Sequence, residues 1–98
     1  MNVVQEMLME EGYSSPKDLV RDISLMLALQ KIEQYKSECE LFEKKYAMAL
    51  KEFDKALHKE KGIEDFEKEE DLADWEFVAK ALNWWQKKVK ELQSDQAL

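Results

Sequence analysis

The chain has 98 residues, with 22 Asp and Glu against 15 Lys and Arg, a net charge of −7, two glycines and one proline. This composition is typical of long helices, and the length allows one domain. The acidic charge disfavours nucleic-acid binding, which needs clustered Lys and Arg, and favours a basic protein partner. The single cysteine excludes an intrachain disulfide, and no apolar run is long enough to span a bilayer, so we expect a cytoplasmic protein without a membrane partner.

The amino-terminal third is predicted to form two helices separated by a short turn. Apolar residues recur at helical spacing from Val3, and the pattern stops at Gly12, because glycine commonly ends helices. Ser15 before Pro16 starts the second helix, since serine caps and proline tolerates the first helical position. No further breaker precedes Tyr46, which predicts a second helix of roughly 31 residues, about 46 Å long.

The long helix changes character along its length. Its first half is apolar on several sides, and we expect these side chains to be buried in a homodimer, since one short chain cannot cover them all. The candidate dimerisation residues are Leu19, Val20, Ile23, Met26 and Leu27. A second apolar line, which alone continues into the other half, has the alternating steps of three and four that are typical of a coiled-coil seam. This seam comprises Leu25, Ala28, Ile32, Tyr35, Cys39, Phe42 and Tyr46, and the pattern leaves open whether it closes within or between chains.

A third helical segment is predicted after a break in the pattern at residues 47–49. Leu50, Phe53 and Leu57 keep helical spacing, and the segment is expected to stop at residues 61–62. The strongly acidic segment 63–71 is predicted to be a loop that places carboxylates at the start of the last helix, where the helix dipole favours them.

The last helix is predicted from about Asp71 to Leu92, antiparallel to the long helix. The predicted fold is therefore all-α, with three to four helices in one domain over residues 1–98. The long central helix has coiled-coil character. Residues 1–46 form the dimerisation-like helices, and residues 47–98 form a second helical pair.

All three tryptophans of the chain fall in the last helix, on different faces. At about 100° per residue, two of them fall on one apolar stripe, which is expected to be buried in the core. This stripe comprises Leu72, Trp75, Val78, Ala79, Leu82, Trp85, Val89 and Leu92. Phe77 and Trp84 align on a second face, and a large aromatic pair there needs another surface, from this protein or a partner, to cover it. The candidate partner-binding residues are Phe66, Glu67, Glu70, Phe77, Trp84 and Lys88.

Patterns for catalysis or metal binding are weak. His58 is the only histidine, and Asp54 lies four residues before it on the same helical face. Two ligands do not make a zinc site, which needs three or four, so a solvent-exposed histidine is expected. Cys39 lies in the seam and is expected to be a buried, inert thiol. The sequence predicts no enzyme, no metal and no cofactor.

Residues 3–34 resemble the helix–turn–helix portion of ribbon–helix–helix antitoxins and repressors. In that family a first helix ends at a glycine, an aromatic and a serine-rich turn follow, and a capped second helix carries an acidic residue, an aliphatic pair and an arginine. The matching residues are Gly12, Tyr13, Ser14, Ser15, Asp18, Leu19, Val20 and Arg21. The family reads DNA with a strand before the first helix. Only Met1 and Asn2 precede Val3 here, so contacts of that kind are not expected.

The chain from Tyr35 onward is similar to small helical proteins of bacteria and archaea, some of them in toxin–antitoxin pairs. Together the two resemblances imply an antitoxin-like protein, dimerised through its first two helices, whose carboxyl-terminal part wraps a toxin that is typically a basic ribonuclease. Three alternatives stay open: a self-associating helical scaffold, a DNA-binding regulator without its ribbon strand, and a metal-dependent enzyme using His58 and Asp54.

Overall fold

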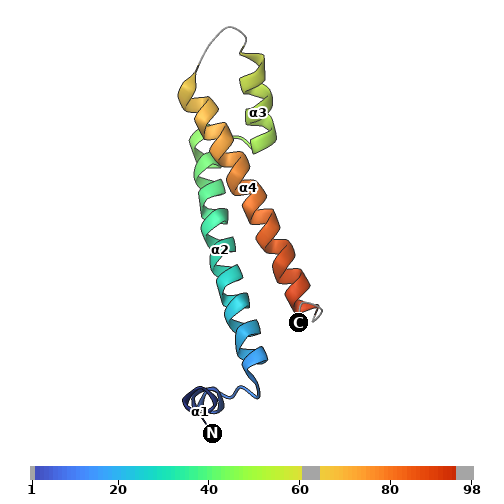
Figure 1. The fold of residues 1–98 in the computed structure, drawn as a ribbon. Coiled ribbons are helices and arrows are strands. Elements are labelled where there is room, and N and C mark those ends of the chain that lie inside the picture. The colour runs from blue at the N-terminus through green and yellow to red at the C-terminus, as the bar shows by residue number, and fades with distance from the viewer. Residues whose placement is uncertain (1, 61–64, 95–98) are drawn as a thin grey trace.

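The computed structural model describes residues 2–60 and 65–94, which are mostly helical. The helices are α1 (Val3–Glu10), α2 (Pro16–Tyr46), α3 (Leu50–Lys59) and α4 (Phe66–Gln93). The two long helices, α2 and α4, pack antiparallel, α3 lies beside one end of this pair, and α1 lies at the opposite end (Figure 1). The prediction of an all-α fold, with a long central helix packed antiparallel to the last helix, is confirmed.

Local sequence sets the two ends of α1. The Asn2 side chain accepts a hydrogen bond of 2.8 Å from the backbone N–H of Gln5, and the Gln5 side chain accepts one from the backbone of Asn2. At the other end Gly12 takes a φ of +86°, and the N–H of Tyr13 donates back to the carbonyl of Leu8 at 2.8 Å. This Schellman arrangement favours glycine because other residues rarely adopt a positive φ.

α2 begins and ends at the predicted residues, Pro16 and Tyr46. The Ser15 hydroxyl accepts a hydrogen bond from the backbone N–H of the third helical residue. After Tyr46, Ala47 adopts a left-handed conformation with a φ of 53°, and α3 starts three residues later. The break that the change of heptad phase predicts is therefore a tight turn. The stop predicted for α3 at residues 61–62 lies outside the described residues.

The core lies between α2 and α4, near the end that α3 covers. Its buried side chains are Cys39, Phe53, Trp75 and Val78. The rings of Phe42, Tyr46 and Phe53 surround Trp75, with ring centroids 5.5, 6.4 and 5.6 Å from the indole. Trp75 is only 2% exposed. The seam predicted on α2 therefore closes within the chain, against α4.

Both predicted apolar stripes meet at this contact. Every residue of the α2 seam and of the α4 stripe is buried or half-buried. The contact continues beyond the aromatic cluster toward α1, because Arg21 Nη2 of α2 donates to the Leu92 carbonyl of α4 at 2.8 Å. Trp75 and Trp85 are thus core residues, as predicted, although Trp85 is less deeply buried.

The start of the last helix differs from the prediction. α4 begins at Phe66 and not near Asp71, so residues 66–71 of the acidic segment are helical. The Asp65 side chain caps the helix by accepting a hydrogen bond of 3.1 Å from the N–H of Lys68. Acidic residues then fill the first turn, where the helix dipole stabilises them. The prediction assigned the whole acidic segment to a loop, whereas a helix can carry these residues on its solvent-facing side.

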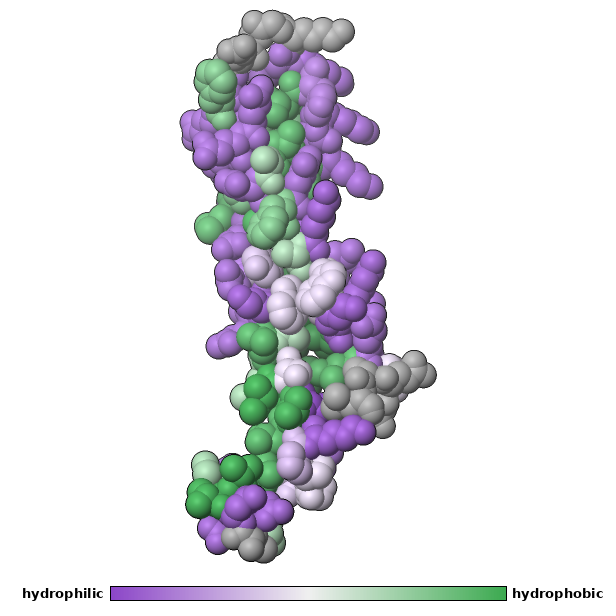
Figure 2. Space-filling view, viewed as in Figure 1, coloured by the Kyte–Doolittle hydropathy of each residue, from purple (hydrophilic) through white to green (hydrophobic). Residues whose placement is uncertain are grey.

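The first half of α2 is not buried within a single chain. We define the amino-terminal apolar surface as nine exposed residues of α1 and α2: Val3, Val4, Met7, Met9, Val20, Ile23, Met26, Leu27 and Leu29. Each of these residues is between 46% and 68% exposed. Hydrophobic side chains gather over α1 and the adjoining part of α2 in the space-filling view (Figure 2). Four of the five candidate dimerisation residues are therefore exposed in a single chain, and Leu19, the fifth, is half-buried.

We expect Trp75→Ala to lower the free energy of unfolding by about 3–5 kcal/mol, because it removes the centre of the aromatic cluster. Trp84→Ala is the matched control on the same helix and should cost less than about 1 kcal/mol, since exposed positions contribute little. Urea unfolding followed by far-UV circular dichroism measures both. If Trp75→Ala does not fold, Trp75→Phe should give an intermediate loss. Equal losses for Trp75→Phe and Trp84→Ala would contradict this assignment of the core.

Candidate protein interaction surfaces

Two aromatic residues of α4 point away from the core. Phe77 is 65% exposed and Trp84 is 51% exposed, although Trp75 on the same helix is 2% exposed. Phe77 and Trp84 lie two turns apart on one side of the helix, about 10 Å along its axis. Large exposed aromatic residues are typical anchors of protein interfaces. The structure places them as their spacing predicts, on a face that the core does not use.

Neighbouring side chains hold the Trp84 ring in place. Its centroid lies 4.9 Å from that of Trp85, with the two rings nearly perpendicular at 84°. Lys88 Nζ lies 5.2 Å from the Trp84 ring centroid and 3.0 Å from Glu91 Oε2. The half-buried Trp85 ring thus packs against one side of Trp84, and Lys88 lies over the Trp84 ring. A binding residue held in this way loses less conformational entropy when a partner covers it.

The other candidate partner-binding residues lie at the opposite end of α4. Phe66 is the first residue of the helix and is 72% exposed. Eleven residues separate it from Phe77, which corresponds to about 16 Å along the axis. Glu67 and Glu70 are exposed near Phe66. The structure therefore places Phe77, Trp84 and Lys88 on the middle and last part of α4. Glu70 lies on the same side, two turns before Phe77, whereas Phe66 and Glu67 lie at the start of the helix.

An ionic network fixes the start of α4 against the end of α2. Lys45 Nζ donates to Asp71 Oδ2 at 2.7 Å and to Glu67 Oε1 at 2.8 Å, and the Tyr46 hydroxyl donates to the same oxygen of Asp71. The hydrogen bond to Asp71 raises the pKa of Lys45. The hydrogen bond from Lys45, followed by the one from Tyr46, lowers the pKa of Asp71. Glu67 is thus already paired within the chain.

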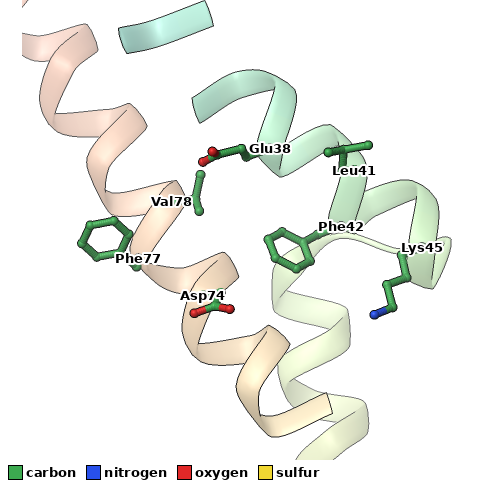
Figure 3. Close-up of a pocket in the computed structure, with 7 residues that line it drawn as sticks. All are labelled: Glu38, Leu41, Phe42, Lys45, Asp74, Phe77 and Val78. Carbon is green, nitrogen blue, oxygen red and sulfur yellow. The ribbon is translucent and has the colours of Figure 1, made fainter. Parts of the chain in front are cut away.

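A groove of about 440 Å³ runs between α2 and α4 on the side of Phe77 (Figure 3). The residues that line it are Glu38, Leu41, Phe42 and Lys45 of α2 and Asp74, Phe77 and Val78 of α4. Phe42 and Val78 point into the space between the helices, and Leu41 and Phe77 flank it (Figure 3). The groove thus has an apolar floor with carboxylates at its rim.

Leu41 is a candidate interaction residue that the sequence reasoning missed. It is 67% exposed and faces the same groove as Phe77. The sequence does carry a signal for it. Between residues 30 and 46, Leu41 is the only apolar residue outside the seam, and an isolated leucine among charged positions has no role in the seam.

The two residues with catalytic potential are placed as predicted. The His58 ring lies 2.9 Å from Asp54 Oδ1 on the exposed side of α3. The hydrogen bond with the Asp54 backbone carbonyl, followed by the Asp54 charge, raises the pKa of His58. Burial, followed by the nearby charge of Glu43, raises the pKa of the Cys39 thiol, which disfavours the nucleophilic thiolate.

The described part of the chain contains neither a metal-binding cluster nor a membrane-spanning helix. Across residues 2–60 and 65–94, no cluster of three or more His, Cys, Asp or Glu side chains could hold a metal ion. No helix in the same ranges is long and apolar enough to cross a membrane.

Comparison of the chain with protein families, curated proteins and solved structures finds no match.

We expect Asp71→Asn to lower the free energy of unfolding at pH 7 by about 1 kcal/mol, because it weakens the bonds from Lys45 and Tyr46. Asp71 has a lowered pKa in the folded state, so its contribution is present above the ordinary value of 3.8. That contribution is lost as the pH falls through the folded pKa.

Urea unfolding of the wild type and Asp71→Asn between pH 7 and pH 2 measures this difference. The matched control is Asp74→Asn, one turn later on α4, whose carboxylate is exposed. A stability difference for Asp71→Asn that stays constant down to pH 2 would show that the carboxylate does not contribute through its charge.

Proposed function

We propose that the protein is a non-enzymatic, antitoxin-like interaction module that binds a cognate basic protein through Phe77 and Trp84. The observation that carries this proposal is the exposure of Phe77 and Trp84 on one side of the helix whose Trp75 is buried in the core, with Phe77 lining the apolar groove. A contiguous apolar surface of this kind marks an interaction site in a protein that is otherwise strongly charged.

The charge of the chain supports a basic partner. Its net charge is −7, and the carboxylates of Glu38 and Asp74 lie at the groove beside Phe77. Lys45, at the same groove, is engaged by Asp71 and Glu67. A partner with clustered Lys and Arg would be attracted to this face and oriented on it. A basic ribonuclease toxin, the typical partner that the family resemblance implies, has this character.

We propose in addition that the protein acts as a homodimer through the amino-terminal apolar surface. The chain exposes 7748 Å², whereas a compact monomer of 11.6 kDa would expose about 5,800 Å². The radius of gyration is 20.1 Å, against about 12.6 Å for a compact domain of this length. The difference of roughly 1,900 Å² per chain is comparable to the area that each subunit buries in an obligate homodimer.

A self-associating scaffold is the alternative function, and the same exposed residues bear on it. In a scaffold, copies of the chain would cover both the amino-terminal apolar surface and Phe77 with Trp84. In the module proposed above, self-association covers the first surface and leaves the second available. The solvent accessibility of Trp84 in the assembled protein therefore separates the two functions, and acrylamide quenching of tryptophan fluorescence measures it.

Co-expression with the protein encoded next to its gene tests the proposed partner binding. We expect the two proteins to co-purify, and this chain to relieve any growth arrest that its neighbour causes. The double variant Phe77→Ser and Trp84→Ser should weaken the Kd by at least about 30-fold, the effect of losing one interface hot spot. Phe66→Ser is the matched control, because Phe66 is more exposed than either residue but lies about 16 Å from Phe77 along the helix, outside the groove. Absence of both the complex and the relief would count against the proposal.

Sedimentation equilibrium tests the proposed dimer. The wild type should sediment as a dimer, and Ile23→Lys should shift it to the monomer, because a charge would be placed in an apolar interface. Leu41→Lys is the matched control, since Leu41 is at least as exposed on the same helix but lies outside the amino-terminal apolar surface. A monomeric wild type, or a dimer unaffected by Ile23→Lys, would refute this interface.

A further inference from the structure

The two long helices have different neighbours on their two sides. On one side α3 packs against them, with Phe53 buried beside Trp75. The Glu76 charge of α4 also acts on His58 of α3. The groove lined by Asp74 and Phe77 lies on the other side of α4, because residues two apart in a helix point about 200° apart. The α2–α4 pair is therefore covered by a third helix on one side and open on the other.

The shape of the open side suits a helix. Phe42 and Val78 form an apolar floor, and the exposed side chains of Leu41 and Phe77 flank it (Figure 3). Along α4 the apolar surface continues through Ala81 to Trp84, at steps of four and three residues. A row at this spacing complements the i, i+3, i+4 and i+7 anchors of an amphipathic helix that lies in a groove. The distance from Phe77 to Trp84, about 10 Å, is two turns of such a helix.

The charges around the groove indicate which charge a complementary ligand would carry. Glu38 and Asp74 line it, and the ammonium group of Lys45 is paired with two carboxylates, Glu67 and Asp71. The local balance is therefore negative. A helix with Lys or Arg beside its apolar anchors would be complementary. The helices of a second copy fit less well, because α1 and α4 carry more carboxylates than Lys and Arg, α2 carries equal numbers of both, and the apolar face of α3 is already packed against its own chain.

We propose that the groove between α2 and α4 binds one basic amphipathic helix of the partner protein. An apolar residue of that helix lies between Leu41 and Phe77, and its Lys or Arg residues approach Glu38 and Asp74. The bound helix occupies the side of the α2–α4 pair opposite α3 and completes a four-helix arrangement. This inference rests on the proposed function, because it assigns the element through which the partner is held.

An 18-residue helical model peptide of Leu and Lys is the probe, and the same peptide with Glu in place of Lys is its counterpart. We expect the full-length protein to bind the Lys peptide at least about tenfold more tightly than the Glu peptide in isothermal titration. Leu41→Glu removes an apolar flank of the groove and should raise the Kd for the Lys peptide at least about tenfold, because the attraction that one more exposed carboxylate adds is too small to offset this loss. The double variant Glu38→Lys and Asp74→Lys should remove the preference between the two peptides.

Two controls show whether any loss is specific to the groove. Phe66→Glu makes the same kind of change at an exposed position remote from it, and Ile23→Lys alters the amino-terminal apolar surface. Both should bind the Lys peptide as the wild type does, and circular dichroism should show that all variants remain helical. Equal binding of the Lys peptide by the wild type and Leu41→Glu, or no binding by the wild type, would overturn the proposal. A Leu41→Glu variant that loses the dimer in sedimentation would also overturn it, because a second copy would then occupy the groove.

The same variants in the complex with the neighbouring gene's product separate this inference from the proposed function. If the complex forms and is weakened by Phe77→Ser and Trp84→Ser but not by Leu41→Glu, the partner binds α4 without using the groove. The proposed function then stands and the groove inference fails. If the Lys peptide binds the groove but the neighbouring product does not bind, the groove inference stands and the choice of that protein as partner fails.

Discussion

The packing of Trp75 against the aromatic side chains of α2 and α3 is the contact on which the rest of the structure depends. It joins three helices at one point, with Phe42 and Tyr46 from α2 and Phe53 from α3 around a side chain that is 2% exposed. Once Trp75 faces inward, the rotation of α4 about its axis is fixed. Phe77 is then turned outward by about 200°, so the buried tryptophan determines which residues of α4 are presented to a partner.

The elongated fold explains why a protein of this size leaves so much apolar surface exposed. α2 and α4 touch along one line, and α3 adds a third helix only at one end. At the other end, among the described residues, only the short α1 and the last turns of α4 lie beside the first half of α2. A two-helix contact buries one stripe of each helix, and the remaining apolar positions of α2 need a further surface. The exposure of the first half of α2 therefore follows from the small number of helices that pack around it.

Much of this architecture is predictable from the sequence because the relevant signals are local. Ser15 with Pro16 sets the start of α2, and the alternating steps of three and four identify the seam that meets α4. Two features needed tertiary information. The first is the early start of α4: its Asp65 cap is a local signal, but Lys45 of α2 also pairs with Glu67 and Asp71, which periodicity does not reveal. The second is the pairing of Leu41 with Phe77 across the groove: the sequence marks Leu41 as an isolated leucine, but the pattern of one helix does not specify which residues of another lie opposite.

The two exposed surfaces lie apart on the molecule, and this separation bears on how the proposed module would work. The amino-terminal apolar surface belongs to α1 and the start of α2, whereas Phe77, Trp84 and the groove lie on the middle of α4 and the second half of α2. A symmetric dimer formed through the first surface would therefore present two copies of the second, and a partner could occupy each without displacing the other chain. Binding at the groove would also stabilise the contact of α2 with α4, because a ligand that binds only the folded state favours that state by mass action. In the proposed function, the stability of the chain would therefore increase with the concentration of its partner.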